Sequence, residues 1–100
     1  MARLDVHPMP GGGAGYVVDV QADLLAHLST RAVVPLLPVA KAPKPITELN
    51  PVYDIQGERC VLMTQAIATV PRQELKRAVG SLAEHHDTVV RALDILLIGY

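Results

Sequence analysis

The chain contains no tryptophan and no phenylalanine, and only three tyrosines among its 100 residues. Half of the residues are nevertheless hydrophobic, so a core must be built from valine, leucine, isoleucine, alanine and methionine. A chain of this length buries roughly two-thirds of the surface that its unfolded form exposes, which suffices for one domain. We therefore predict a single aliphatic domain that spans residues 1–100.

Net charge is nearly absent too, since nine lysines and arginines face ten aspartates and glutamates, for a formal charge of −1. A protein that holds nucleic acid by electrostatic attraction normally shows a basic patch or a high isoelectric point. The charge balance therefore argues against DNA or RNA binding by the isolated chain.

Long hydrophobic runs and paired cysteines are missing as well. The longest apolar run, from Ala32 to Ala40, is about half a membrane span and contains two prolines. Arg3 and Asp5 place a charge pair where a signal peptide needs an apolar segment. The single cysteine, Cys60, cannot form an internal disulfide, and its apolar neighbours predict a buried residue. We therefore expect a cytoplasmic protein with no membrane contact.

The first two-thirds of the chain show short strand patterns separated by turn signals. The predicted strands are residues 4–7, 16–20, 32–37, 52–55, 59–64 and 67–70. Residues 21–25 break the alternation and predict a turn or a single helical turn. This pattern indicates an α+β, mainly β fold: a small SH3-like barrel or twisted antiparallel sheet with a C-terminal α-helix.

That helix is predicted from Glu84 to Leu97. The positions with the spacing of a buried helical face are Leu82, His86, Val89, Leu93 and Leu96. The apolar positions left off this face are Val90, Leu97 and Ile98. A second apolar face on a peripheral helix is usually an interface, most often with another copy of the chain. We therefore expect a homodimer.

The chain ends on apolar residues, where most domains leave a polar, frayed tail. Ile95 to Ile98 are all apolar, and Gly99 and Tyr100 follow them. A free end cannot be fully buried, whereas a docking tip gains from apolar side chains. Leu24 and Leu25 are also apolar residues on a predicted turn. We expect both sets to bind a partner, although burial within an irregular segment is an equal alternative for Leu24 and Leu25.

The sequence contains no catalytic or metal-binding pattern. Adjacent helical residues point about 100° apart, so His85 and His86 cannot face one metal, and no second cluster completes a ligand set. His7 and His27 are isolated and are expected at the surface. Cys60 has no neighbouring histidine in the sequence and is expected in the core. We therefore expect no metal, no cofactor and no catalytic residue.

Two blocks of sequence resemble one known family. The first comprises residues 16–25 and 31–36, and the second comprises residues 50–55, 63–65 and 68–71. Together with the apolar helix that closes on a penultimate glycine, they resemble CcdB, the toxin of a plasmid-type toxin–antitoxin pair. The resemblance covers nearly the whole chain. It implies a homodimer built from a barrel-like antiparallel sheet and a C-terminal helix.

The resemblance also implies a function. Proteins of this kind poison DNA gyrase by inserting the helix ends of the dimer into the dimerisation region of the A subunit, which traps the enzyme–DNA cleavage complex. A disordered segment of the cognate antitoxin wraps and neutralises the toxin. The toxin and antitoxin together repress their own operon, so operator DNA is bound only through that complex.

The target-binding residues that the resemblance implies are Leu24, Leu25, Arg91, Asp94, Ile98, Gly99 and Tyr100. Gly99 matches the penultimate glycine of the family. Ile98 stands where the family has tryptophan, and Tyr100 where it has isoleucine. The two leucines replace isoleucines, and the two charged residues replace asparagines. Because tryptophan is a typical interface hot spot, these changes are expected to alter how the target is read.

Two alternatives stay open. The same fold hosts sequence-specific mRNA endoribonucleases of the MazF/Kid type, which need a cationic groove and an acid–base pair. The basic residues available for such a groove, all in predicted loops, are Arg31, Lys41, Lys44, Arg72, Lys76 and Arg77. The other alternative is a non-toxic member that is retained for antitoxin binding and operon control.

Overall fold

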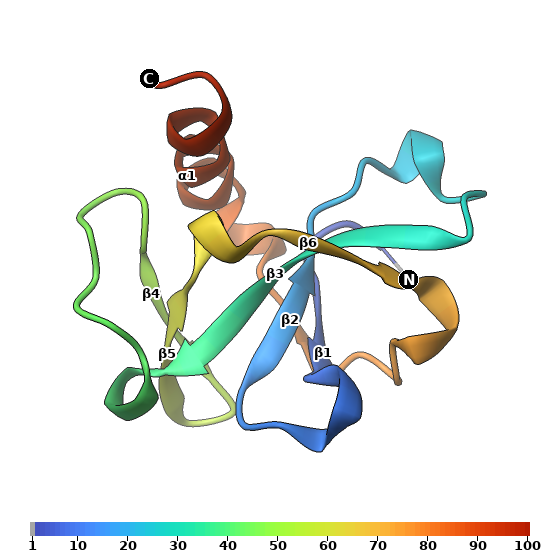
Figure 1. Cartoon of the computed structure of the whole chain (residues 1–100), viewed down its shortest axis with the longest axis horizontal. Coiled ribbons are helices and arrows are strands. Elements are labelled where there is room, and N and C mark those ends of the chain that lie inside the picture. The colour runs from blue at the N-terminus through green and yellow to red at the C-terminus, as the bar shows by residue number, and fades with distance from the viewer. Residues whose placement is uncertain (1) are drawn as a thin grey trace.

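Within residues 2–100, which the computed structural model describes, seven strands form one antiparallel sheet that curls into a nearly closed barrel (Figure 1). The strands are β1 (Asp5–Pro8), β2 (Tyr16–Asp19), β3 (Thr30–Pro38), β4 (Val52–Ile55), β5 (Glu58–Leu62), β6 (Ala68–Pro71) and β7 (Gly80–Ser81). Their order is β4-β5-β3-β2-β1-β7, and β6 pairs with β3. Met1 lies outside the described residues. Two predictions begin at this residue: the domain of residues 1–100 and an N-terminus without a signal peptide.

The six predicted strands are confirmed, with ends displaced by no more than two residues, and only the two-residue β7 was missed. The nine-residue β3 curves the sheet because it has two partners along one edge. Its first half pairs with β6 and its second half with β5. Pro35, which has no N–H to donate, lies where the partner changes.

One α-helix, α1 (His86–Leu97), follows β7 and packs on the sheet (Figure 1). The short 3₁₀ helices are η1 (Pro10–Gly12), η2 (Asp23–Leu25), η3 (Val39–Lys41), η4 (Thr64–Ala66), η5 (Arg72–Glu74) and η6 (Ala83–His85). The predicted helix is thus confirmed, with its first two residues in η6 instead of α1. The single helical turn expected within residues 21–25 is confirmed as η2. No helix in the described part of the chain is long and apolar enough to cross a bilayer.

The core lies between the concave face of the sheet and α1. Alternate residues of the strands point into it, among them Val18, Val34 and Leu62, while Val89 supplies the helix side. The core side chains are Leu4, Val6, Val18, Val20, Val34, Leu36, Tyr53, Ile55, Cys60, Leu62, Leu82, Val89, Ala92 and Leu93. The expectation of a purely aliphatic core therefore holds except for one tyrosine, and the predicted burial of Cys60 is confirmed.

Three of the five positions predicted for the buried face of the helix are confirmed as buried. Leu82, Val89 and Leu93 are buried, whereas Leu96 is half-buried and His86 is exposed. His86 is exposed because it is the first residue of α1, beyond the edge of the core. There its imidazole contacts other exposed polar groups instead of apolar side chains.

Two expectations about polar residues are wrong, because both side chains are buried. His7 was expected at the surface but is 1% exposed, and its Nδ1 donates to the carbonyl oxygen of Lys76 at 2.6 Å. Arg31 was placed in a loop but lies in β3, also 1% exposed, against Asp19. The Lys76 segment, far from β1 in sequence, thus covers His7, whereas Arg31 is paired with the neighbouring strand β2. His27 is exposed, as predicted.

Candidate target-binding site

The C-terminal tip, residues 97–100, projects from the body at the end of α1 (Figure 1). The backbone N–H groups of Ile98 and Gly99 both donate to the carbonyl oxygen of Asp94, at 2.8 and 3.0 Å. Gly99 then adopts φ +94°, a left-handed conformation that commonly ends helices and favours glycine. The apolar side chains of the tip are well exposed, at 69% for Leu97, 59% for Ile98 and 78% for Tyr100.

The direction of the tip follows from how the start of α1 is anchored to β4. The Tyr53 hydroxyl and Thr88 Oγ1 share a hydrogen bond of 2.5 Å, and Thr88 Oγ1 lies 3.0 Å from the carbonyl oxygen of His85. The rings of Tyr53 and His85 lie 5.0 Å apart in a tilted arrangement. Burial raises the pKa of Tyr53, and the hydrogen bond with Thr88 offsets part of that rise.

Arg91 and Asp94 lie on α1 before the tip, and the structure gives them intramolecular roles. Arg91 Nε lies 3.1 Å from Glu48 Oε2, in an ion pair whose side chains are both more than half exposed. Such a pair contributes at most about 1 kcal/mol, so a partner carboxylate can displace Glu48. The backbone carbonyl of Asp94 holds the turn of the tip, and its side chain is half-buried.

Leu24 and Leu25 are exposed at 86% and 41%, which decides against their burial in the core. They lie in η2, on the loop between β2 and β3 (residues 20–29, the β2–β3 loop). Leu28, which sequence reasoning missed, is 39% exposed on the same loop. Its signal was available, since it is a third apolar residue, three positions after Leu25 and before the next predicted strand begins.

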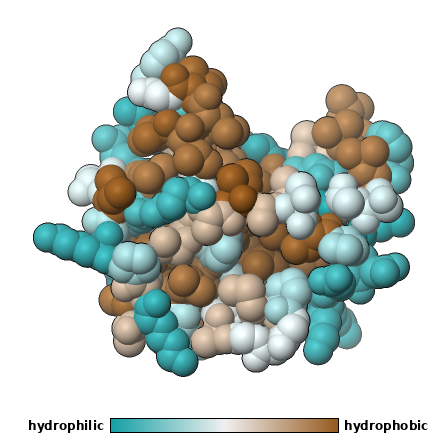
Figure 2. Space-filling model, in the orientation of Figure 1, coloured by the Kyte–Doolittle hydropathy of each residue, from teal (hydrophilic) through white to brown (hydrophobic). Residues whose placement is uncertain are grey.

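The structure does not place these leucines beside the tip. Figure 2 shows apolar side chains gathered over the end of α1 and again over the β2–β3 loop, with a gap between the two projections. The reason is that α1 contacts η4 and is linked to β4 through Tyr53 and Thr88, whereas the β2–β3 loop connects the two central strands of the sheet order. The chain therefore presents two separate apolar surfaces.

An exposed polar group lies at the start of α1. His86 has Arg3 Nη1 3.5 Å from its Nε2 and Asp87 Oδ1 3.2 Å from its Nδ1. An imidazole between a guanidinium and a carboxylate could transfer protons, yet these side chains lie on an open surface. Residues 2–100 contain no pocket beside them. No group of three or more metal-ligating side chains was found in the same residues.

Solved structures of toxins share this architecture. The MazF-mt6 toxin of Mycobacterium tuberculosis superposes with a TM-score of 0.77 at 17% identity, over 94% of this chain and 96% of that one. A second Mtb toxin gives 0.74 at 17% identity, over 93% and 99%. An endoribonuclease in complex with its cognate antitoxin, from a mycobacterial species, gives 0.74 at 17% identity, over 97% and 94%. At this identity the likeness establishes the fold.

The fold is thus one used by toxins of toxin–antitoxin systems. The family model described as CcdB protein matches residues 3–99, so the chain belongs to the CcdB family and is the toxin component of such a system. No curated protein matches the sequence.

Proposed function

We propose that this protein is a gyrase poison, which acts by binding and not by catalysis. The observation that carries the proposal is the apolar tip, presented on the left-handed turn at Gly99 in a member of the CcdB family. Burying one large apolar side chain contributes about 1.5–3 kcal/mol. The side chains of Leu97, Ile98 and Tyr100 therefore provide enough apolar surface for a specific contact with the A subunit of DNA gyrase.

The active species in this proposal is a homodimer. Val90, Ile95 and Leu96 are apolar side chains of α1 that remain half-buried. A second copy of the chain would cover part of this apolar surface and would present two tips to a two-fold symmetric target. Sedimentation should then show a dimer, and the protein should remain a dimer when the tip is removed.

A cognate antitoxin is the second proposed partner. The structural neighbour solved with its antitoxin supports this partner, and family membership supports joint repression of the operon. Operator DNA would be bound through the complex, since the toxin carries a formal charge of only −1.

Supercoiling by purified gyrase, with detection of the trapped cleavage complex, tests the proposal. Ile98→Ser should lose inhibition. Ile46→Ser is the matched control, because Ile46 is an isoleucine of nearly equal exposure, 57% against 59%, away from the tip. No inhibition by the wild-type dimer at micromolar excess would overturn gyrase poisoning. If antitoxin binding and operon repression nevertheless persisted, the non-toxic alternative would replace it.

An mRNA endoribonuclease is the second candidate, and the contacts of His86 with Arg3 and Asp87 are the observation that favours it. Incubation with mRNA decides between the two functions. Discrete cuts that disappear in His86→Ala would establish the nuclease, whereas intact RNA would exclude it.

A further inference from the structure

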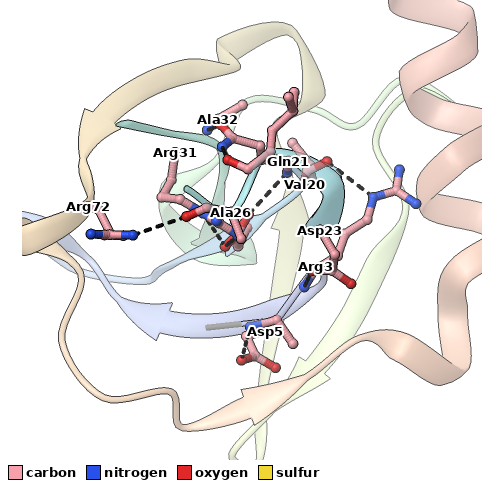
Figure 3. A network of polar contacts seen from close by, with 12 residues as sticks. Arg3, Asp5, Val20, Gln21, Asp23, Ala26, Arg31, Ala32 and Arg72 are labelled. Carbon is pink, nitrogen blue, oxygen red and sulfur yellow. Dashed lines mark hydrogen bonds and ion pairs between the residues drawn. The ribbon is translucent and has the colours of Figure 1, made fainter. Parts of the chain in front are cut away.

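The side chains of Arg3, Gln21 and Arg72, from three parts of the chain, donate to backbone carbonyls of the β2–β3 loop (Figure 3). The side chain of Gln21 links the start of the loop to β3. Its Nε2 donates to the carbonyl oxygen of Leu25 at 3.0 Å, and its Oε1 accepts from the backbone N–H of Ala32 at 3.0 Å. Gln21 is itself only 9% exposed, so water competes little for these bonds.

Arg72, which follows β6, holds the other side of the loop. Its Nη1 donates to the carbonyl oxygen of Ala26 at 3.0 Å, and its backbone N–H donates to the carbonyl oxygen of Ser29 at 2.8 Å. Arg3 adds a third attachment, from its backbone N–H to Asp23 Oδ1 at 2.9 Å. Gln21 and Arg72 thus hold the backbone carbonyls of Leu25 and Ala26, within the segment that carries the exposed leucines.

A buried ion pair at the end of β2 fixes the start of this loop. Asp19 Oδ1 accepts the backbone N–H of Gln21 at 3.0 Å, while its Oδ2 accepts from Arg31. The loop therefore starts from a fixed point at the end of β2. Its short backbone bonds, such as Leu28 N–H to the Leu25 carbonyl at 3.1 Å, complete a defined conformation.

We propose that Gln21 and Arg72 are positioning residues for target binding, which hold Leu24, Leu25 and Leu28 as a preordered second contact surface. This inference rests on the proposed function. A loop that is ordered before binding loses less conformational entropy on contact, so its leucines contribute more affinity. Neither Gln21 nor Arg72 needs to touch the target.

Arg72→Ala provides the first test, because Arg72 is exposed and its removal leaves the core intact. Amide hydrogen exchange should accelerate by about tenfold at residues 25, 26 and 28, whose protection depends on loop opening, and should stay unchanged in β2 and β3. Affinity for the gyrase A subunit should fall by about tenfold. Arg72→Lys, which still offers a donor to the Ala26 carbonyl, should recover part of both. Arg59→Ala, another exposed arginine, is the matched control.

Gln21→Glu removes the donation to the Leu25 carbonyl and keeps an acceptor for Ala32, although it also adds a negative charge at a nearly buried position. It should accelerate exchange in the loop while the sheet keeps its protection.

A double-mutant cycle separates positioning from direct contact. If Arg72 acts through the leucines, Arg72→Ala should weaken binding no further in a Leu24→Ser, Leu25→Ser background. Additive losses would overturn the inference, as would unchanged exchange or unchanged affinity in Arg72→Ala. Absence of binding by the wild type would overturn the proposed function. The exchange data would still decide whether the two side chains hold the loop.

Discussion

Arg31 and Asp19 form an ion pair that solvent does not reach, with Arg31 Nη2 2.5 Å and Nε 2.9 Å from the same oxygen, Asp19 Oδ2. The pair joins the end of β2 to the beginning of β3. Its other carboxylate oxygen receives the backbone N–H of Gln21. This buried contact therefore connects the stability of the barrel to the loop that carries the exposed leucines.

Asp19→Ala should destabilise the protein severely, by about 3–5 kcal/mol, because it leaves the Arg31 guanidinium buried without a counter-charge. This is a large part of the stability of a small domain, which is about 5–15 kcal/mol in total. Urea unfolding followed by circular dichroism measures the change. A loss below about 1 kcal/mol, the size expected of an exposed pair, would contradict the prediction.

Tyr53 should make the protein less stable at alkaline pH. Burial disfavours the phenolate and raises the pKa of Tyr53 in the folded state, even though the Thr88 hydrogen bond opposes this. Its contribution is therefore complete below the unfolded value of about 10 and is lost as pH rises through the folded value. Denaturation midpoints measured from about pH 8 to about pH 11 cover this range.

Tyr53→Phe is the control for this dependence, because it removes the ionisable hydroxyl and keeps the ring. At neutral pH the free energy of unfolding of the variant should be about 1 kcal/mol lower, because the hydrogen bond with Thr88 is missing. Above about pH 10 its free energy of unfolding should fall less than that of the wild type. Parallel pH profiles for the two proteins would show that Tyr53 does not titrate in the unfolding transition.

The Cys60 thiol should be inert in the folded protein. It is 0% exposed, and burial together with the Glu58 and Asp54 carboxylates raises its pKa, so little of the reactive thiolate forms at neutral pH. An aromatic disulfide reagent should react only after urea unfolds the chain. Rapid labelling under native conditions would mean that β5 opens locally far more often than the rest of the core.

Gly99→Ala should impair target binding without unfolding the protein. A residue with a Cβ at φ +94° is strained by about 1–2 kcal/mol, and the free tip can relieve this by changing direction. The melting temperature should shift by less than about 2 °C, while gyrase inhibition falls. Removal of Gly99 and Tyr100 should behave in the same way. A large fall in melting temperature for either variant would make the tip structural.

The sequence by itself determined the strands, the aliphatic core, the C-terminal helix and the exposed tip. These features depend on local properties: β-branched alternation marks β2 and β3, and helical spacing marks Val89 and Leu93. The CcdB family was also recognisable, because its motifs are contiguous blocks.

Only the tertiary structure decided which polar residues are buried and where the binding surfaces lie. His7 is buried under Lys76, and Arg72 reaches Ala26, across 69 and 46 positions of the chain. The two apolar surfaces separate because α1 and the β2–β3 loop attach to different parts of the barrel. Such contacts arise from how the sheet curls, and the residues on either side carry no local pattern that indicates their partners.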